Sequence, residues 1–215
     1  MKNAQRLLLC LPLLITLMAC KESAAKYTVG PNADLNGIVF GKKILSNTDL
    51  TGANLTDANL NSVDLTGSLL TSADLTRATS NKDTILKRAN LDSALLVNAS
   101  MLATDFTGAS LSGTNLSDAK LAGANFTQAN MRGAVLSGAS LDDAIMKGAV
   151  LTAANLEGAN SKQNLNLGDS NLVDAILKSA SLLGTNFTNA SMVRADLSGA
   201  FLGTSDFTGA NLSDA

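Results

Sequence analysis

Histidine, aromatic residues and proline are scarce in this chain. Its 215 residues include no His, no Trp, one Tyr, two Pro and six Phe, although 46% are hydrophobic. Most of the hydrophobic residues are Leu and Ala, and such side chains pack well in thin layers rather than in one large core. Without His, the chain lacks the usual proton shuttle and the commonest metal ligand. This composition lowers the expectation of a catalytic site, a metal site or a bound cofactor, and we predict none of the three.

Cysteine and net charge exclude further classes of protein. Both cysteines, Cys10 and Cys20, lie near the N-terminus, so the body of the chain cannot form a disulfide framework or a thiolate zinc site. Removal of residues 1–19 would take away Lys2 and Arg6 and leave 14 basic against 18 acidic residues. This balance predicts no nucleic-acid-binding surface and no strongly acidic one.

The segment 1–19 has the pattern of a secretory signal. Lys2 and Arg6 precede an apolar segment, Leu7–Leu17, that is too short to span a membrane. The segment ends in Leu17-Met18-Ala19-Cys20, which resembles the bacterial lipobox, in which the Cys thiol receives a diacylglycerol. We predict a lipoprotein with a signal peptide at 1–19, an acylated Cys20 and a polar tether at 20–32. The alternative is an ordinary cleaved signal with an incidental cysteine.

The residue after Cys20 bears on localisation. Lys21 stands where, in enteric bacteria, an Asp marks inner-membrane lipoproteins. Resemblance to that sorting rule favours the outer membrane, facing the periplasm, if the source is Gram-negative. Two or three acyl chains would give stable anchoring, which a single chain does not.

From residue 33 to the end, a period of five residues dominates the chain. A large apolar residue, here called the central residue, occupies 34 of 36 repeat positions, and Ser80 and Ser161 occupy the other two. The residue two before it is Ala in 24 of the 36 repeats. Thirteen of the 17 Gly lie two residues after a central residue, where a tight turn needs permissive backbone angles.

Neither a helix nor a flat strand can use this period. In an α-helix, five residues rotate successive Leu by about 140° and spread them around the cylinder. In a flat strand an odd period sends successive Leu to opposite faces. A chain that turns a corner every five residues can present the same two positions inward each time, so we predict an all-β solenoid.

The repeat resembles the A-[ND]-L-x-x motif of the pentapeptide-repeat family, as in Ala53-Asn54-Leu55. The resemblance covers residues 33–215. It implies a right-handed quadrilateral β-helix with four pentapeptides to a coil, and 36 repeats then make about nine coils.

The period slips by one residue twice, near 79–83 and 160–164. The slips could separate distinct solenoids or be single-residue bulges in one solenoid. If they are bulges, Phe106, Phe126, Phe187 and Phe207 all fall on one face. Stacking of like rings favours that arrangement, so we predict one continuous rod.

Charged residues at and near the slips form a candidate interaction ridge: Lys82, Asp83, Lys87, Arg88 and Lys162. The alternative is that they are solvated charges around a tolerated bulge.

The function that fits these features is a non-catalytic, membrane-anchored scaffold of the cell envelope that binds an unknown protein partner. One alternative comes from the resemblance, because some family members protect DNA gyrase by imitating duplex DNA. An enzyme is a second alternative, although a convex rod without long insertions offers little of the concavity that a catalytic site needs. We also expect that the last coil, which exposes Leu197, Leu202, Phe207 and Leu212, either frays or joins a second copy in a homodimer.

Overall fold

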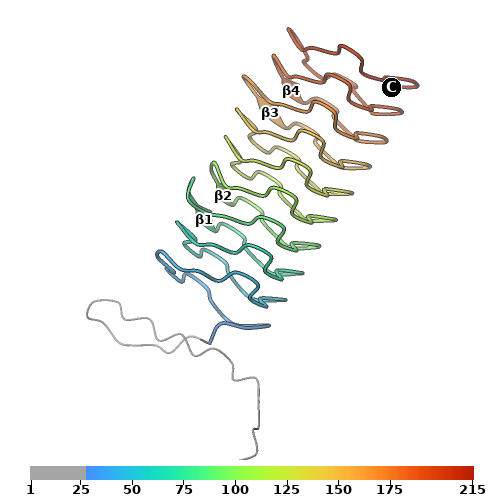
Figure 1. Cartoon of the computed structure of the whole chain (residues 1–215). Helices are drawn as coiled ribbons and strands as arrows, with labels where there is room; N and C mark the ends of the chain where they lie inside the picture. The colour runs from blue at the N-terminus through green and yellow to red at the C-terminus, as the bar shows by residue number, and fades with distance from the viewer. Residues whose placement is uncertain (1–27) are drawn as a thin grey trace, which may run out of the picture.

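The described part of the chain is a single column of stacked coils. The computed structural model describes residues 28–215, so the predicted signal peptide, Cys20 and most of the predicted tether lie outside the described residues. In Figure 1 the column runs without interruption from the blue first coil to the red last coil. The sequence predicted this all-β solenoid, and no helix occurs within residues 28–215.

Neighbouring coils pair through parallel β-bridges. Along most of the column a residue pairs with the one four pentapeptides further along the chain, as in Asp34 with Asn54 and Asn54 with Asp74. Four pentapeptides therefore complete one turn of the chain. The longest strands in the described chain have two residues: β1 is Thr79–Ser80, β2 is Ser100–Met101, β3 is Asn160–Ser161 and β4 is Ser181–Leu182. β1 pairs with β2, and β3 pairs with β4.

We name the four faces of the column by the central residues of its first coil. The first, second, third and fourth faces begin with Leu35, Phe40, Leu45 and Leu50, and all four side chains are buried. Each face continues upward through residues joined by the bridge ladder. The corner that follows a central residue takes the number of that face.

A corner is a four-residue turn with two supports. At Leu50 the amide of Ala53 donates to the Leu50 carbonyl at 3.0 Å, and Gly52 adopts a φ of +66°. The Asp49 carboxylate, just before the central residue, accepts a hydrogen bond from the Thr51 amide at 2.9 Å. Short polar side chains favour turns through such local bonds. Where the motif has Asp or Asn before the central residue, this side chain can therefore support the turn.

The corners contain many residues other than glycine. The sequence located the corner from its glycines, but 22 non-glycine residues also have positive φ, among them Asp57 at 58° and Arg77 at 57°. The left-handed conformation costs such residues about 1–2 kcal/mol each. Ladder bonds offset this cost, such as the 2.9 Å bond from the Asp57 amide to the Thr76 carbonyl. Glycine is therefore favoured at the corner without being required.

The core consists of two layers of side chains along every face. Ala119 and Leu121, from one ordinary repeat, are fully buried, as the period predicted. On the third face the ring of Phe106 stacks on that of Phe126 at 4.7 Å, and Phe187 stacks on Phe207 at 4.9 Å. Such stacked pairs add to the stability that apolar burial provides.

The bridge ladder passes through both slips. Asn59 pairs with Thr79 at the ordinary spacing of four pentapeptides, whereas Asp64 pairs with Ile85, one position beyond that spacing. The same change occurs between the pair Ser140–Asn160 and the pair Ile145–Asn166. Each slip therefore adds one residue at the second corner, and the coils on either side of it stay paired.

Candidate interaction surface

The carboxylates and amides of the outer surface are mostly engaged in turns. Asn125 Oδ1 accepts hydrogen bonds from the amide and the hydroxyl of Thr127 at 3.0 and 2.6 Å. Hydrogen bonds from the Thr66 hydroxyl and amide lower the pKa of Asp64. A general acid at neutral pH needs a raised pKa instead. These side chains therefore fit a structural role better than a catalytic one.

Ion pairs connect successive coils at the corners. Arg77 donates from Nε and Nη2 to the Asp57 carboxylate, both at 2.7 Å, and Arg194 forms the same paired contact with Asp174. The hydrogen bonds from Arg77 lower the pKa of Asp57. Both pairs are largely exposed, so screening by water limits their effect on stability. They make the surface one of mixed charge.

The first slip lies next to Lys82 and Asp83. Asn81 Oδ1 accepts bonds from the amides of Ser62 at 3.0 Å and Asp83 at 3.1 Å. Inside the column, the Thr84 hydroxyl donates to the Leu60 carbonyl at 2.9 Å.

The small central residue of this slip, Ser80, is held through its hydroxyl, which contacts the hydroxyl of Thr104. No buried side-chain nitrogen or oxygen of the described residues lacks a partner.

The second slip is held from outside by the preceding coil. The Lys162 amide donates to Asp142 Oδ1 at 2.6 Å, and Asn164 Nδ2 donates to Asp143 Oδ1 at 2.8 Å. In the core, Leu165 occupies a position where most repeats have Ala, four residues after the small central residue Ser161, and both are fully buried. The sequence marked the slip but gave no role to Asp142, Asp143 or Leu165.

The five residues of the candidate ridge fall into three places. Lys82 and Asp83 lie at the second corner, whereas Lys87 and Arg88 lie at the third corner of the same coil. Lys87 pairs with Asp105 at 3.1 Å. Lys162 lies at the second corner four bridges further along, about 19 Å from Lys82 at about 4.8 Å per rung. The structure thus does not bring the five into one cluster.

A row of lysines along the second face unites part of this ridge with residues that sequence reasoning missed. Lys42, Lys82, Lys120 and Lys162 recur at every second coil of this face and its corner, and all four are exposed. Two rungs separate successive members, which is about 10 Å. The lysine row can be recognised in the sequence only when residues one coil apart are aligned.

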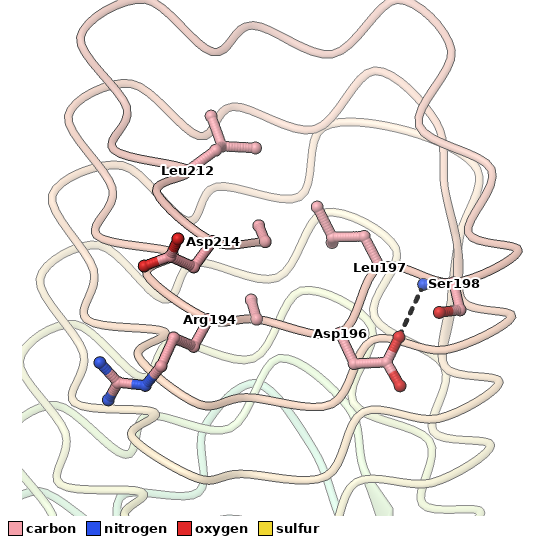
Figure 2. Close-up of a pocket in the computed structure, with 8 residues that line it drawn as sticks. Arg194, Asp196, Leu197, Ser198, Leu212 and Asp214 are labelled. Atoms are coloured by element: carbon pink, nitrogen blue, oxygen red, sulfur yellow. Dashed lines mark hydrogen bonds between the residues drawn. The ribbon is translucent and has the colours of Figure 1, made fainter.

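A shallow pocket of about 530 Å³ lies at the last coil. Its lining includes Leu197, Leu212 and Asp214, and Figure 2 shows Leu197 and Leu212 from adjoining parts of the coil. The Asp196 carboxylate beside it accepts a bond from the Ser198 amide at 2.9 Å. The apolar side of the pocket is the incompletely covered end of the core. Its polar side chains include ones that already take part in corner turns.

The part of the chain at residues 28–215 forms no helix with the length and apolar character of a membrane span. It also contains no group of three or more His, Cys, Asp or Glu side chains placed to hold a metal ion.

Comparison with protein families shows what the repeat is. The family model for pentapeptide repeats matches in 8 copies, over residues 32–67, 45–77, 84–121, 119–158, 163–192 and 193–215. The chain belongs to the pentapeptide-repeat family. No curated protein sequence matches the chain at a significant level.

Solved pentapeptide-repeat structures resemble most of the chain. HetL, a protein involved in heterocyst differentiation regulation in the cyanobacterium Nostoc sp. strain PCC 7120, is 31% identical over 84% of this chain and 87% of its own, with a TM-score of 0.49. A trypsin-treated form of QnrB1, a plasmid-mediated fluoroquinolone resistance protein, is 16% identical over 83% of this chain and 85% of its own, with a TM-score of 0.55. At that identity, the second likeness shows the fold alone.

Proposed function

We propose that this pentapeptide-repeat protein is a non-catalytic scaffold of the cell envelope, anchored to a membrane by acyl chains on Cys20. The anchored body is a right-handed β-helix of about nine coils. The sequence from Leu17 to Cys20 supports the anchor. Stacked coils that spread regularly spaced side chains over flat faces support the scaffold role. If the source is Gram-negative, the protein belongs to the outer membrane and faces the periplasm.

The observation that carries the scaffold proposal is the lysine row on the second face. Lys42, Lys82, Lys120 and Lys162 present positive charge about every 10 Å along that face. The same face also carries Asp83, Asp142 and Asp143, and the last two accept hydrogen bonds from the second slip. Electrostatic complementarity favours a protein partner with an acidic surface.

Loss of the acylated cysteine tests the anchor. Wild type and Cys20→Ala are expressed in the native host, and membranes are separated from soluble fractions. We expect the wild type in the membrane fraction and the variant in the soluble fraction. Equal membrane association of the two proteins would refute the lipoprotein proposal.

Charge reversal tests the partner. Cells expressing the protein with Lys82→Glu, Lys120→Glu and Lys162→Glu are treated with a cross-linker, alongside cells with Arg132→Glu, which lies at the fourth corner. We expect the first variant to lose cross-linked species that the wild type and the control retain. If both variants retain them equally, the second face is not the binding surface.

The described surface does not favour DNA mimicry. Such a mimic needs strong negative charge along a face, whereas here acidic and basic side chains of successive coils pair with each other, as Asp57 and Arg77 do. The two carboxylates nearest the second slip also lie within the lysine row. We expect the mature domain to give DNA gyrase no protection from quinolones in a supercoiling assay.

The last coil is the proposed site of self-association. Leu197, Leu202 and Phe207 pack against the core yet stay partly exposed, and Leu212 is 38% exposed. Two such coils in contact would bury these side chains in a symmetric dimer. Light scattering tests this proposal, because a folded protein that stays monomeric across the micromolar range would contradict it.

A further inference from the structure

A patch of apolar and basic side chains lies at the N-terminal end of the column. We call Val39, Lys42, Lys43 and Ile44 the N-terminal patch. They surround the second corner of the first coil, with Val39 on the second face and Ile44 on the third. Ile44 is 81% exposed and Val39 59%, whereas Ile145, five bridges further along the third face, is 39% exposed. The patch therefore exposes aliphatic surface well beyond the level of an inner coil.

Val39 and Ile44 lie on the first described coil, which has a neighbouring coil on one side only, and the local backbone also differs there. At this corner the left-handed residue is Gly41, one residue after the central Phe40, whereas at the next coil it is Ser62, two residues after Leu60. Lys43 then occupies the inward position that Ala fills in most repeats, and it is only partly buried. The corner projects two lysines and two aliphatic side chains.

These side chains add little to the fold. Ile44 stands where Asp64 stands on the next coil, and Asp64 accepts a turn-closing bond from the Thr66 amide at 2.9 Å. An isoleucine can form no such bond, and at its exposure it gains little from apolar burial. The patch therefore calls for a partner outside the column.

We propose that the N-terminal patch binds the surface of the anionic bilayer to which Cys20 is anchored. Aliphatic side chains that enter the headgroup region, flanked by lysines that meet anionic lipid, are what an interfacial contact requires. The proposal rests on the anchor proposed above. Val39 lies nineteen positions after Cys20, and a fully extended chain of that length spans at most about 65 Å, so the patch stays within reach of the membrane.

The tether makes a weak contact sufficient. Anchoring holds the patch at a high effective concentration near the lipid, so the contact needs little intrinsic affinity. The tether carries Lys21 and Lys26 and one acidic residue between them, Glu22. Asp64, beside Ile44, is the nearest opposing charge on the third face.

The contact sets the direction of the rod. Phe201, 66% exposed, lies on the second face like Val39 but eight bridges away, which is about 38 Å. If only the N-terminal patch meets the bilayer, the column stands on the membrane with its last coil remote from it. If the whole second face met the bilayer, Phe201 would be embedded as well.

Fluorescent labels at single cysteines test the proposal on the acylated full-length protein in vesicles. The variants are Val39→Cys, Ile44→Cys, Ile145→Cys and Phe201→Cys. Since Cys10 leaves with the signal peptide and Cys20 is acylated, the introduced thiol alone takes the label. The vesicles contain brominated phosphatidylcholine with a minority of phosphatidylglycerol. We expect labels at 39 and 44 to be quenched several-fold more strongly than labels at 145 and 201.

Other results would overturn the proposal. Equal quenching at all four sites, or none at 39 and 44, would show that the patch does not meet lipid. Strong quenching at 201 would show that the rod lies flat. Shielding of 39 and 44 before lipid is added, increasing with protein concentration, would show that a second copy covers the patch.

A charge control separates this proposal from the anchor. Lys42→Glu with Lys43→Glu should reduce the quenching at 44 at least twofold, whereas Lys147→Glu should leave it unchanged. If the acylated protein floats with vesicles but its patch labels are not quenched, the anchor stands and the patch proposal fails. If wild type and Cys20→Ala both fail to float, the anchor fails and the patch proposal falls with it.

Discussion

Each of the two slips adds one extra residue at the second corner, yet the surrounding side chains accommodate the two insertions differently. At the first slip, the hydroxyl of Ser80 contacts that of Thr104, and Thr84 donates to the Leu60 carbonyl, as Thr114 does to the Leu91 carbonyl in an ordinary coil. At the second slip, the Ser161 hydroxyl donates to the Gln163 carbonyl at 3.0 Å, and Leu165 adds apolar volume at the inward position that follows. Both slips thus give a buried serine hydroxyl a partner, and the second also exchanges large and small side chains between its inward positions.

The corners of the two slips differ in a parallel way. At the first slip, Asn81 of the slip itself accepts a hydrogen bond from the amide of Ser62 in the previous coil. At the second slip the previous coil supplies the acceptors, since Asp142 and Asp143 bind Lys162 and Asn164. The extra residue therefore needs polar partners across the coil boundary, and either coil can provide them.

The largest effect is expected from Leu165→Ala. Ser161 cannot fill the space that is left, so the free energy of unfolding should fall by about 3–5 kcal/mol, at the upper end for a buried Leu truncated to Ala. Urea denaturation followed by circular dichroism measures the loss, with Leu116→Ala in an ordinary coil as the reference. A loss below about 1 kcal/mol would show that Leu165 does not fill this part of the core.

A compensating exchange should recover much of that loss. Ser161→Leu combined with Leu165→Ala restores the ordinary repeat pattern of a large central residue and a small inward one. We expect the double variant to be more stable than Leu165→Ala by about 1–3 kcal/mol, the size of coupling found between contacting residues. A double-mutant cycle by urea denaturation measures it, and additive effects would argue against volume exchange.

A smaller loss is expected at the first slip from Thr84→Val. The change keeps the shape but removes the hydroxyl that bonds to Leu60, leaving that carbonyl without this buried partner. We expect a loss of about 1–2 kcal/mol by thermal or urea unfolding. Thr152→Val, at a half-buried outer position away from the slips, is the control and should change stability by no more than about 0.5 kcal/mol. Equal losses at both positions would show that the buried hydroxyl of Thr84 adds nothing to stability.

The smallest effect concerns acid. Asp64 lies beside the first slip, paired with Ile85, and its pKa in the folded protein lies below the ordinary value of 3.8, mainly because of the hydrogen bond from the Thr66 hydroxyl. A carboxyl with a lowered folded pKa contributes stability above its unfolded pKa and loses it as the pH falls through the folded value. Asp64→Asn keeps an acceptor for the turn but does not titrate, so it should flatten the loss of stability below about pH 4.

Urea midpoints at pH 7 and in the acid range test this prediction. Asn166→Asp places a carboxylate on the later coil of the equivalent pair at the second slip, where Ile145 pairs with Asn166. Residue 168 is Gly and offers the turn its amide but no hydroxyl, so this variant should introduce a smaller acid sensitivity than Asp64 does. If Asp64→Asn leaves the pH dependence unchanged, the turn bond to Asp64 does not affect acid stability.

The sequence alone determined which positions face inward. A large residue every fifth position, with Ala two before it, leaves no other periodic arrangement of a chain with both positions buried. The same period put the four stacked phenylalanines on one face once each slip was counted as a single extra residue. The family followed from the same motif.

Only the tertiary structure decided what happens between coils. Arg77 meets Asp57, Asn164 meets Asp143, and the lysines of the second face align because the ladder fixes residues one coil apart at neighbouring heights. A five-residue period does not fix which side chains meet across that distance, because the pairing depends on the path of the chain through every corner. The exposure of Ile44 also depends on its place in the column, since the first described coil has a neighbouring coil on one side only. The repeat pattern determined which side chains are buried, and the contacts between coils determined how the exposed side chains are arranged.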